Sequence, residues 1–293
     1  MRRRASGELP HWPLHLFLLL MLVVTIYPLL WVATIAFSGG QSLSIANLPP
    51  DAGAGDRLRA ITPWPEHLSI SNFRSLFGDQ PFARWLANSV IVAAATTFLG
   101  VLLASTSAYA YSRFRFPGRR AGLMMFLVSQ MFPGTLMLIP LYIIIVQWLG
   151  LGSTYTGLVL VYTVTAIPFC VWMMKGYFDT IPRELEESAL IDGASQAVIF
   201  FRIVLPLAKP AVAVTALFSF MTAWNEFIQA ATFMNKEEMY TAPVGLRFFV
   251  GGYSQQWGYF AAGSIVAAIP IMVLFMFLQK YLVSGLTAGA VKG

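Results

Sequence analysis

Residues 185–210 read LEESALIDGASQAVIFFRIVLPLAKP, and this stretch contrasts with the apolar sequence on both sides of it. Four acidic residues gather around its start, namely Glu184, Glu186, Glu187 and Asp192. A glycine at position 193 follows them, and prolines stand at positions 206 and 210. The pattern predicts a short helical protrusion exposed to water between two apolar regions.

The sequence outside this stretch contains runs that carry no charged residue when histidine is counted as neutral. These runs cover residues 9–50, 85–112, 121–174 and 248–279. Only 11% of all residues are charged, whereas a soluble domain carries about 25%. Because a helix of roughly 20 apolar residues crosses a membrane, the sequence predicts an all-α integral membrane protein.

The apolar runs divide into six predicted transmembrane helices. Their approximate ranges are 13–37, 88–111, 122–148, 155–174, 211–233 and 259–283. The first range is longer than the apolar part of a secretory signal, which has about 7–15 residues. We therefore interpret it as an uncleaved first span, and six spans place both termini on one side of the membrane.

The positions of the basic residues decide which side that is. Thirteen of the 19 lysine and arginine residues lie in residues 1–12, in the 113–120 turn, in the 175–209 loop or at the C-terminal end. Cytoplasmic loops are enriched in these residues, so we predict that both termini and the 175–209 loop are cytoplasmic. That loop also carries five acidic residues, which membrane insertion does not require.

Local physical chemistry shapes the protrusion as a helix, a turn and a second helix. Pro182 suits a first helical turn, and Glu184 favours the positive N-terminal end of the helix dipole. Gly193 permits a turn that a residue with a Cβ atom would resist. A second amphipathic piece covers residues 195–202, and we expect Pro206 to end it. Such a knob, with small apolar residues between carboxylates, suits a partner groove that carries basic residues.

The spacing within the knob resembles the EAA motif, E-A-A-x3-G-x9-I-x-L-P, of the permease subunits of bacterial ABC importers. The matching residues are Glu187, Ser188, Ala189, Gly193, Ile203, Leu205 and Pro206, with Ser188 where the motif has alanine. The stretches NFRSLF at 72–77, WNEF at 224–227 and GLTAGAVKG at 285–293 are similar to the carbohydrate-uptake branch of that family, above all to its maltose/maltodextrin permeases. The resemblance implies that the knob is a coupling helix, which docks into a cleft of an ATPase subunit.

The resemblance also implies an organisation and a set of partners. Residues 1–12 would be a cytoplasmic arm and residues 13–293 the permease domain, with a core at about 85–285, a coupling loop at 179–209 and a cytoplasmic tail at 284–293. The partners would be a second permease subunit, two ATPase subunits, an extracytoplasmic sugar-binding protein and membrane lipid, but no nucleic acid. ATP and Mg would bind to the ATPase subunits, and this chain would hold no cofactor. Its location would be the cytoplasmic (inner) membrane, crossed several times.

Two further groups of residues are candidates for contact with a sugar or with its binding protein. Glu226 is the only acidic residue inside a predicted span, where a carboxylate is costly and function is the first hypothesis. With Trp224, Asn225 and Gln229 it would line the translocation path, or it would brace neighbouring helices. The second group occupies the place of the external loop that reaches the binding protein in maltose-type permeases, although an interfacial aromatic belt is the alternative. Its members are Gly245, Phe248, Phe249, Gly251, Gly252 and Tyr253.

Signatures of other protein classes are weak in this sequence. It has no Gly-Lys pair, and therefore no P-loop that would cradle a nucleotide phosphate. Its three histidines show no zinc-ligand spacing, so we predict no metal site and no catalytic residues. A secondary transporter, a membrane-embedded enzyme and a permease for another solute (trehalose, another oligosaccharide or glycerol-3-phosphate) are the alternatives.

Overall fold

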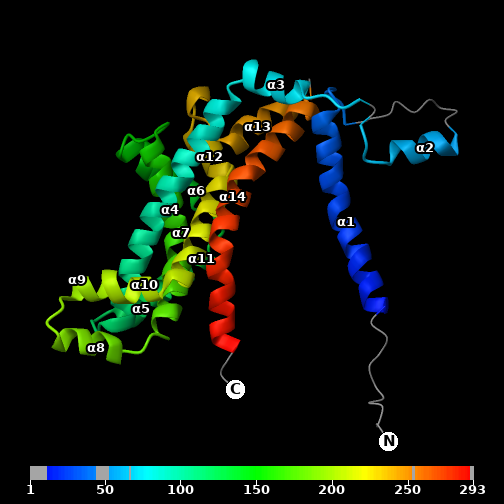
Figure 1. Cartoon of the computed structure of the whole chain (residues 1–293). Coiled ribbons are helices and arrows are strands. Elements are labelled where there is room, and N and C mark those ends of the chain that lie inside the picture. The colour runs from blue at the N-terminus through cyan, green and yellow to red at the C-terminus, as the bar shows by residue number, and fades with distance from the viewer. Residues whose placement is uncertain (1–11, 44–52, 66, 253–254, 291–293) are drawn as a thin grey trace, which may run out of the picture. The chain divides into compact units, whose positions relative to one another are not determined.

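The structure is a computed structural model that describes residues 12–43, 53–65, 67–252 and 255–290. Throughout these residues every regular element is a helix, and no strand is present (Figure 1). The prediction of an all-α chain is therefore confirmed. Residues 1–11 of the predicted arm 1–12, the contact-loop candidate Tyr253 and the last three residues of the predicted tail lie outside the described residues.

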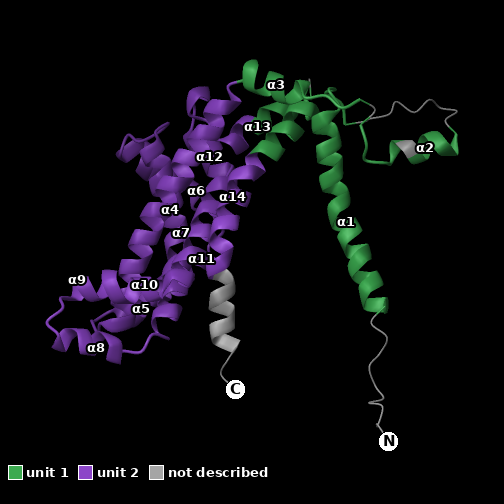
Figure 2. Cartoon of the chain, viewed as in Figure 1, with its two compact units in different colours: residues 1–80, 246–266 green, residues 81–245, 267–293 purple. Residues whose placement is uncertain are grey.

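The chain divides into two compact units, which are described separately (Figure 2). The first comprises residues 1–80 and 246–266, and the second comprises residues 81–245 and 267–293. Two helices run from one unit into the other, α13 (Ala242–Val250) and α14 (Trp257–Ala290). Because α14 extends to Ala290, part of the predicted tail is helical.

The first unit contains α1 (Trp12–Phe37), α2 (Ala54–Ala60) and α3 (Ser71–Gly78). Helix α1 is mostly apolar, carries no acidic or basic residue other than His15, and buries only Thr34, Ile35 and Ala36, as expected of a helix that faces lipid. Asn72 of α3 binds the C-terminal end of α1. The amide nitrogen of this buried residue lies within 3.3 Å of the carbonyl oxygens of Ile35, Ala36 and Gly40.

These bonds lead to a stability prediction for the first unit. Replacing Asn72 with alanine removes the donor to the Ala36 and Gly40 carbonyls, while the Ile35 carbonyl keeps the Ser38 amide and hydroxyl. We therefore expect the free energy of unfolding to fall by about 1–3 kcal/mol. Thermal unfolding in detergent measures the loss. Asn235→Ala is the matched control, because Asn235 is exposed and its side chain has no partner among the described residues. Equal midpoints for the two variants would contradict the capping role.

The second unit is built on α4 (Phe82–Arg113), α7 (Tyr155–Phe178) and α11 (Lys209–Asn225). Helix α4 packs along both of the others, and the three lie side by side in Figure 1. Small residues allow this close approach, as is usual between membrane helices. At one crossing, a Cβ atom on Gly100 of α4 would lie 3.3 Å from the hydroxyl oxygen of Ser219 on α11.

Two of the predicted spans are interrupted helices. The range 122–148 consists of α5 (Arg119–Met131), a non-helical turn with Pro133 and Gly134, α6 (Leu138–Tyr142) and the π-helix η1 (Ile143–Trp148). The range 211–233 consists of most of α11, a break at Glu226 and α12 (Ile228–Phe233). Non-helical backbone within a membrane requires protein or water around it.

By length and composition, the described residues contain four helices that could each cross a membrane. They are Trp12–Phe37, Phe82–Arg113, Tyr155–Phe178 and Trp257–Tyr281. Gln196–Leu207 and Lys209–Asn225, bent by 81° against each other, would form a fifth if the pair is one span. The number of six stays a prediction.

Candidate functional site: the helical knob and its polar network

The predicted knob begins with α8 (Glu184–Ile191), which has three acidic residues in its first turn. Carboxylates there favour the positive end of the helix dipole. The helix ends in a Schellman motif, because the Ala194 amide donates to the Ala189 carbonyl at 2.9 Å and the Gly193 amide to the Leu190 carbonyl at 3.0 Å. Gly193 has a φ of +82°, a conformation that glycine adopts without strain.

The second piece of the knob is longer than predicted. Ser195 caps α9 (Gln196–Ile199), and the π-helix η2 (Phe200–Val204) and α10 (Leu205–Leu207) follow. The expectation that Pro206 ends this piece is off by one residue, because the continuous helical run Gln196–Leu207 includes Pro206 and ends directly after it. The bend comes after Leu207, before α11 begins at Lys209.

The motif residues divide between an outer and an inner surface of the knob. Glu187 and Ser188 are exposed, whereas Ala189 is half-buried. Ala189, Ile203 and Leu205 pack against the core of the second unit. The neighbouring apolar residues Leu190 and Ile191 leave 46% and 87% of their surfaces exposed. An exposed carboxylate beside exposed apolar side chains is a surface suited to another protein.

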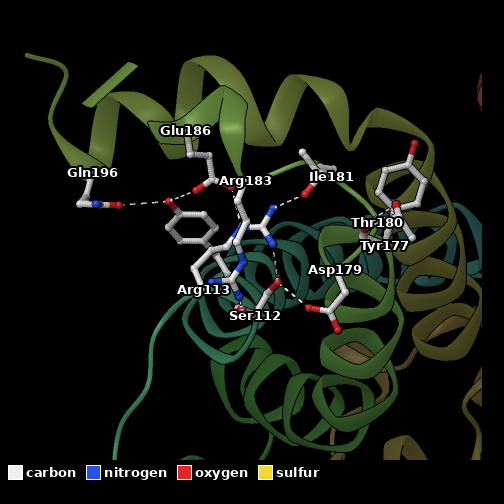
Figure 3. A network of polar contacts seen from close by, with 10 residues as sticks. Ser112, Arg113, Tyr177, Asp179, Thr180, Ile181, Arg183, Glu186 and Gln196 are labelled. Carbon is white, nitrogen blue, oxygen red and sulfur yellow. Dashed lines mark hydrogen bonds and ion pairs between the residues drawn. The ribbon is translucent and has the colours of Figure 1, made fainter. Parts of the chain in front are cut away.

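Beneath this surface lies a network of buried polar groups centred on Glu186 (Figure 3). The Arg113 Nε atom donates to one carboxylate oxygen of Glu186 at 2.5 Å, and the Tyr109 hydroxyl donates to the other at 2.9 Å. Arg113 is the last residue of α4. The network therefore joins α8 to the end of a helix that is long and apolar enough to cross a membrane.

A second branch of the network joins the end of α4 to the end of α7. The Ser112 hydroxyl donates to Asp179 at 2.6 Å, and Lys175 forms an ion pair with the same carboxylate. Burial by itself would raise the pKa of Asp179, but the hydrogen bonds from Lys175 and Ser112 outweigh it and hold this pKa below its ordinary value. Asp179 is therefore the charged partner of this branch near neutral pH.

Sequence reasoning did not find this network. It used the basic residues of the 113–120 turn only to orient the chain, and it gave Glu186 and Asp179 no structural role. Arg113 is instead buried in an ion pair. Arg115, Arg119 and Arg120 form no side-chain hydrogen bond or ion pair with the part of the chain that the structure describes, which agrees with an anchoring role.

The candidate path residues lie around the break between α11 and α12. Trp224 is buried, stacks on Phe220 at 5.3 Å and donates to the Ala267 carbonyl at 3.1 Å. One carboxylate oxygen of Glu226 accepts a hydrogen bond from the backbone amide of Gln229 at 2.8 Å. The Glu226 side chain therefore caps the start of α12. Gln229 is buried, and Asn225 is exposed. The cap gives Glu226 a local structural role, and the path and bracing interpretations both stay predictions.

The candidate contact loop is largely helical, since residues 242–250 form α13. In the second unit, Gly245 lies beneath the indole ring of Trp85. In the first unit, Phe249 is 3% exposed and packs on Tyr259, whereas Phe248 is 58% exposed. A Cβ atom on Gly251 would meet the side chain of Arg247, and Gly252 is exposed. Phe248 is thus the accessible aromatic residue of the described candidates.

Comparison with known proteins identifies the family. Residues 96–288 match the family described as the inner membrane component of binding-protein-dependent transport systems. The chain belongs to this family. The maltodextrin transport system permease protein MdxG of Bacillus subtilis (strain 168) is 40% identical to this permease over 280 residues, covering 95% of each chain. The galactooligosaccharides transport system permease protein GanQ of the same organism is 38% identical over 283 residues, covering 95% of this permease and 94% of GanQ.

A solved structure has the same fold. A bacterial ABC transporter involved in the import of the acidic polysaccharide alginate contains a chain that matches with a TM-score of 0.77 at 20% identity, covering 96% of this permease and 99% of that chain. The prediction of an ABC importer permease is thereby confirmed. So is the prediction of a non-catalytic transmembrane subunit, because the homologues are permease components.

Proposed function

We propose that this permease imports maltose or maltodextrin across the cytoplasmic membrane, driven by ATP hydrolysis on separate subunits. It would cross the membrane six times with both termini in the cytoplasm. A second, MalF-like permease, two MalK-like ATPase subunits holding ATP and Mg, and an extracytoplasmic sugar-binding protein would complete the transporter. The chain itself would bind no cofactor and catalyse no chemical reaction.

The exposed surface of α8 is the observation that carries this proposal. It combines Glu187 with the exposed apolar side chains of Leu190 and Ile191, at the end of the second unit where α8 and α9 lie in Figure 1. An apolar surface beside a carboxylate suits a cleft that has apolar walls and a basic residue. Movement of that cleft as the ATPase dimer closes would push α8 and switch the path from inward-facing to outward-facing.

The choice of maltodextrin rests on the relatives and is finer than the family assignment. MdxG carries maltodextrin in its name and GanQ carries galactooligosaccharides, at nearly equal identity to this permease. Both names denote neutral oligosaccharides, which agrees with predicted spans that offer an anionic solute no lysine or arginine except Lys280. Another oligosaccharide is therefore the second candidate, ahead of trehalose and glycerol-3-phosphate.

Sugar-stimulated ATP hydrolysis tests this choice. The complete transporter in proteoliposomes, with its own binding protein, would be given maltose, maltotriose, trehalose, a galactooligosaccharide and glycerol-3-phosphate in turn. We expect maltose or maltotriose to raise ATP hydrolysis and to accumulate inside the vesicles. Stimulation by the galactooligosaccharide alone would reject maltodextrin and keep the permease function. Import by the permease without any ATPase subunit would reject an ABC mechanism.

A further inference from the structure

Glu186 is the one buried acidic residue among the residues that the structure describes, with 8% of its surface exposed. Its neighbour Glu187 is exposed. Consecutive residues of an α-helix point about 100° apart, so the two carboxylates leave α8 in different directions. Burying a charge is costly unless the charge is paired. The inward carboxylate therefore needs an explanation separate from that of the outward one.

Both oxygens of the Glu186 carboxylate are bonded to the last turns of α4. Arg113 Nε lies 2.5 Å from one oxygen, and the Tyr109 hydroxyl lies 2.9 Å from the other. The Arg113 and Glu186 side chains are only 7% and 10% exposed. Such a pair is screened by solvent far less than a surface ion pair, and its geometry is fixed from two directions.

Two further bonds cross between the end of α4 and the segment that leads into α8. Arg113 also donates to the Ile181 carbonyl at 3.0 Å, and Arg183 donates in the opposite direction to the Ser112 carbonyl at 3.1 Å. Figure 3 shows both arginines between Glu186 and Asp179. This crossed pair of bonds holds the connecting segment, which has no helix of its own between Phe178 and Glu184.

The network reaches the second piece of the knob through Tyr109. Its hydroxyl oxygen lies 3.2 Å from the side-chain amide of Gln196 in α9. A hydroxyl has one proton to donate, and the charged Glu186 is the closer acceptor. The Gln196 amide, whose two ends are interchangeable by rotation, then satisfies the hydroxyl best by donating its NH₂ group. One tyrosine of α4 thus contacts both α8 and α9.

We propose that Glu186, acting through Arg113 and Tyr109, is a positioning residue that fixes the coupling helix to the end of α4. A displacement of α8 then passes into α4 and is not absorbed by the segment between α7 and α8. The inference rests on the proposed function, in which an ATPase subunit moves α8. In this proposal Glu187 contacts the ATPase subunit, and Glu186 transmits the resulting movement of α8 to α4.

The test compares Glu186→Gln with Glu184→Gln in the complete transporter in proteoliposomes. Both substitutions remove a carboxylate from α8, but Glu184 is exposed and its side chain has no partner among the described residues. We expect Glu186→Gln to lower the maltotriose moved per ATP hydrolysed by about tenfold, with the complex recovered in normal amount. Glu184→Gln should match the wild type. A normal ratio of maltotriose moved to ATP hydrolysed in the assembled Glu186→Gln complex would overturn the proposal.

A second measurement does not depend on the solute. Hydrogen–deuterium exchange with and without ATP is compared at residues 184–191 and at the far end of α4, residues 82–89. In the wild type we expect ATP to change exchange in both segments, and in Glu186→Gln only in α8. A change in both segments of the variant would overturn the positioning role. If the wild type moved no maltotriose, the choice of solute would fail while this comparison still decided the role of Glu186.

Rescue separates positioning from folding. Should Glu186→Gln fail to assemble, the exchanged pair Arg113→Glu with Glu186→Arg restores opposite charges at the same two positions. We expect the double variant to regain assembly and part of the transport ratio that either single reversal loses. Assembly without any recovery of the ratio beyond the single variants would contradict an ion pair that acts as a positioning contact.

Discussion

Replacing Glu187 with lysine is expected to lower sugar import by about 100-fold or more, since like charges brought together at an interface cost several kcal/mol. Glu187 is exposed, so its removal leaves no buried group unpaired and the permease itself should fold. The loss should appear as failure to retain the ATPase subunits, or as ATP hydrolysis that no longer drives import. Affinity purification followed by transport in proteoliposomes distinguishes these two forms.

Two further variants serve as controls for Glu187→Lys. Glu187→Gln removes the charge without reversing it, so we expect an intermediate loss. Glu238→Lys reverses a charge at an exposed position of the segment before α13, outside the knob, and should retain the ATPase subunits normally. Normal import by Glu187→Lys would count against the whole interpretation of α8 as the coupling helix, whichever solute is carried.

The knob could be predicted because its information is local. Acidic residues that start a helix, a glycine that ends it and the motif spacing all lie within about one loop, and the structure gives α8 and a left-handed Gly193 as expected. The Glu186–Arg113 pair could not be predicted, because its partners are 73 residues apart. Their meeting depends on where α4 ends relative to α8, which only the packing of α4 and α7 determines.

Hydropathy alone does not reveal the two interrupted spans, for a different reason. Hydropathy is insensitive to a break when the residues on both sides are mostly apolar, and ranges 122–148 and 211–233 carry no charged residue except Glu226. Pro133 and Gly134 were a local signal for the first break. The second break had its own signal in Glu226, whose carboxylate caps the helix that restarts after it. A carboxylate in a span can therefore indicate a helix end as well as a binding site.

Gly245, a candidate for contact with the binding protein, has a packing role in the structure. Trp85 is 2% exposed, and its indole nitrogen donates to the Glu237 carbonyl at 3.0 Å, so the ring is held in position. A Cβ atom on Gly245 would overlap ring atoms of this side chain. Asn88 donates to the Glu238 and Tyr240 carbonyls at 2.9 and 2.8 Å and fixes the same segment to α4. The room to move aside is therefore small.

Replacing Gly245 with alanine is accordingly expected to destabilise the permease by about 1–3 kcal/mol, and valine by more, since extra atoms in a packed site force neighbours out of place. Thermal unfolding in detergent measures this loss. Gly176→Ala is the control, because a Cβ atom there meets nothing within 4 Å and alanine favours a helix interior over glycine by up to about 1 kcal/mol. If Gly245 served binding-protein contact alone, Gly245→Ala would unfold like the wild type and lose only affinity for the binding protein.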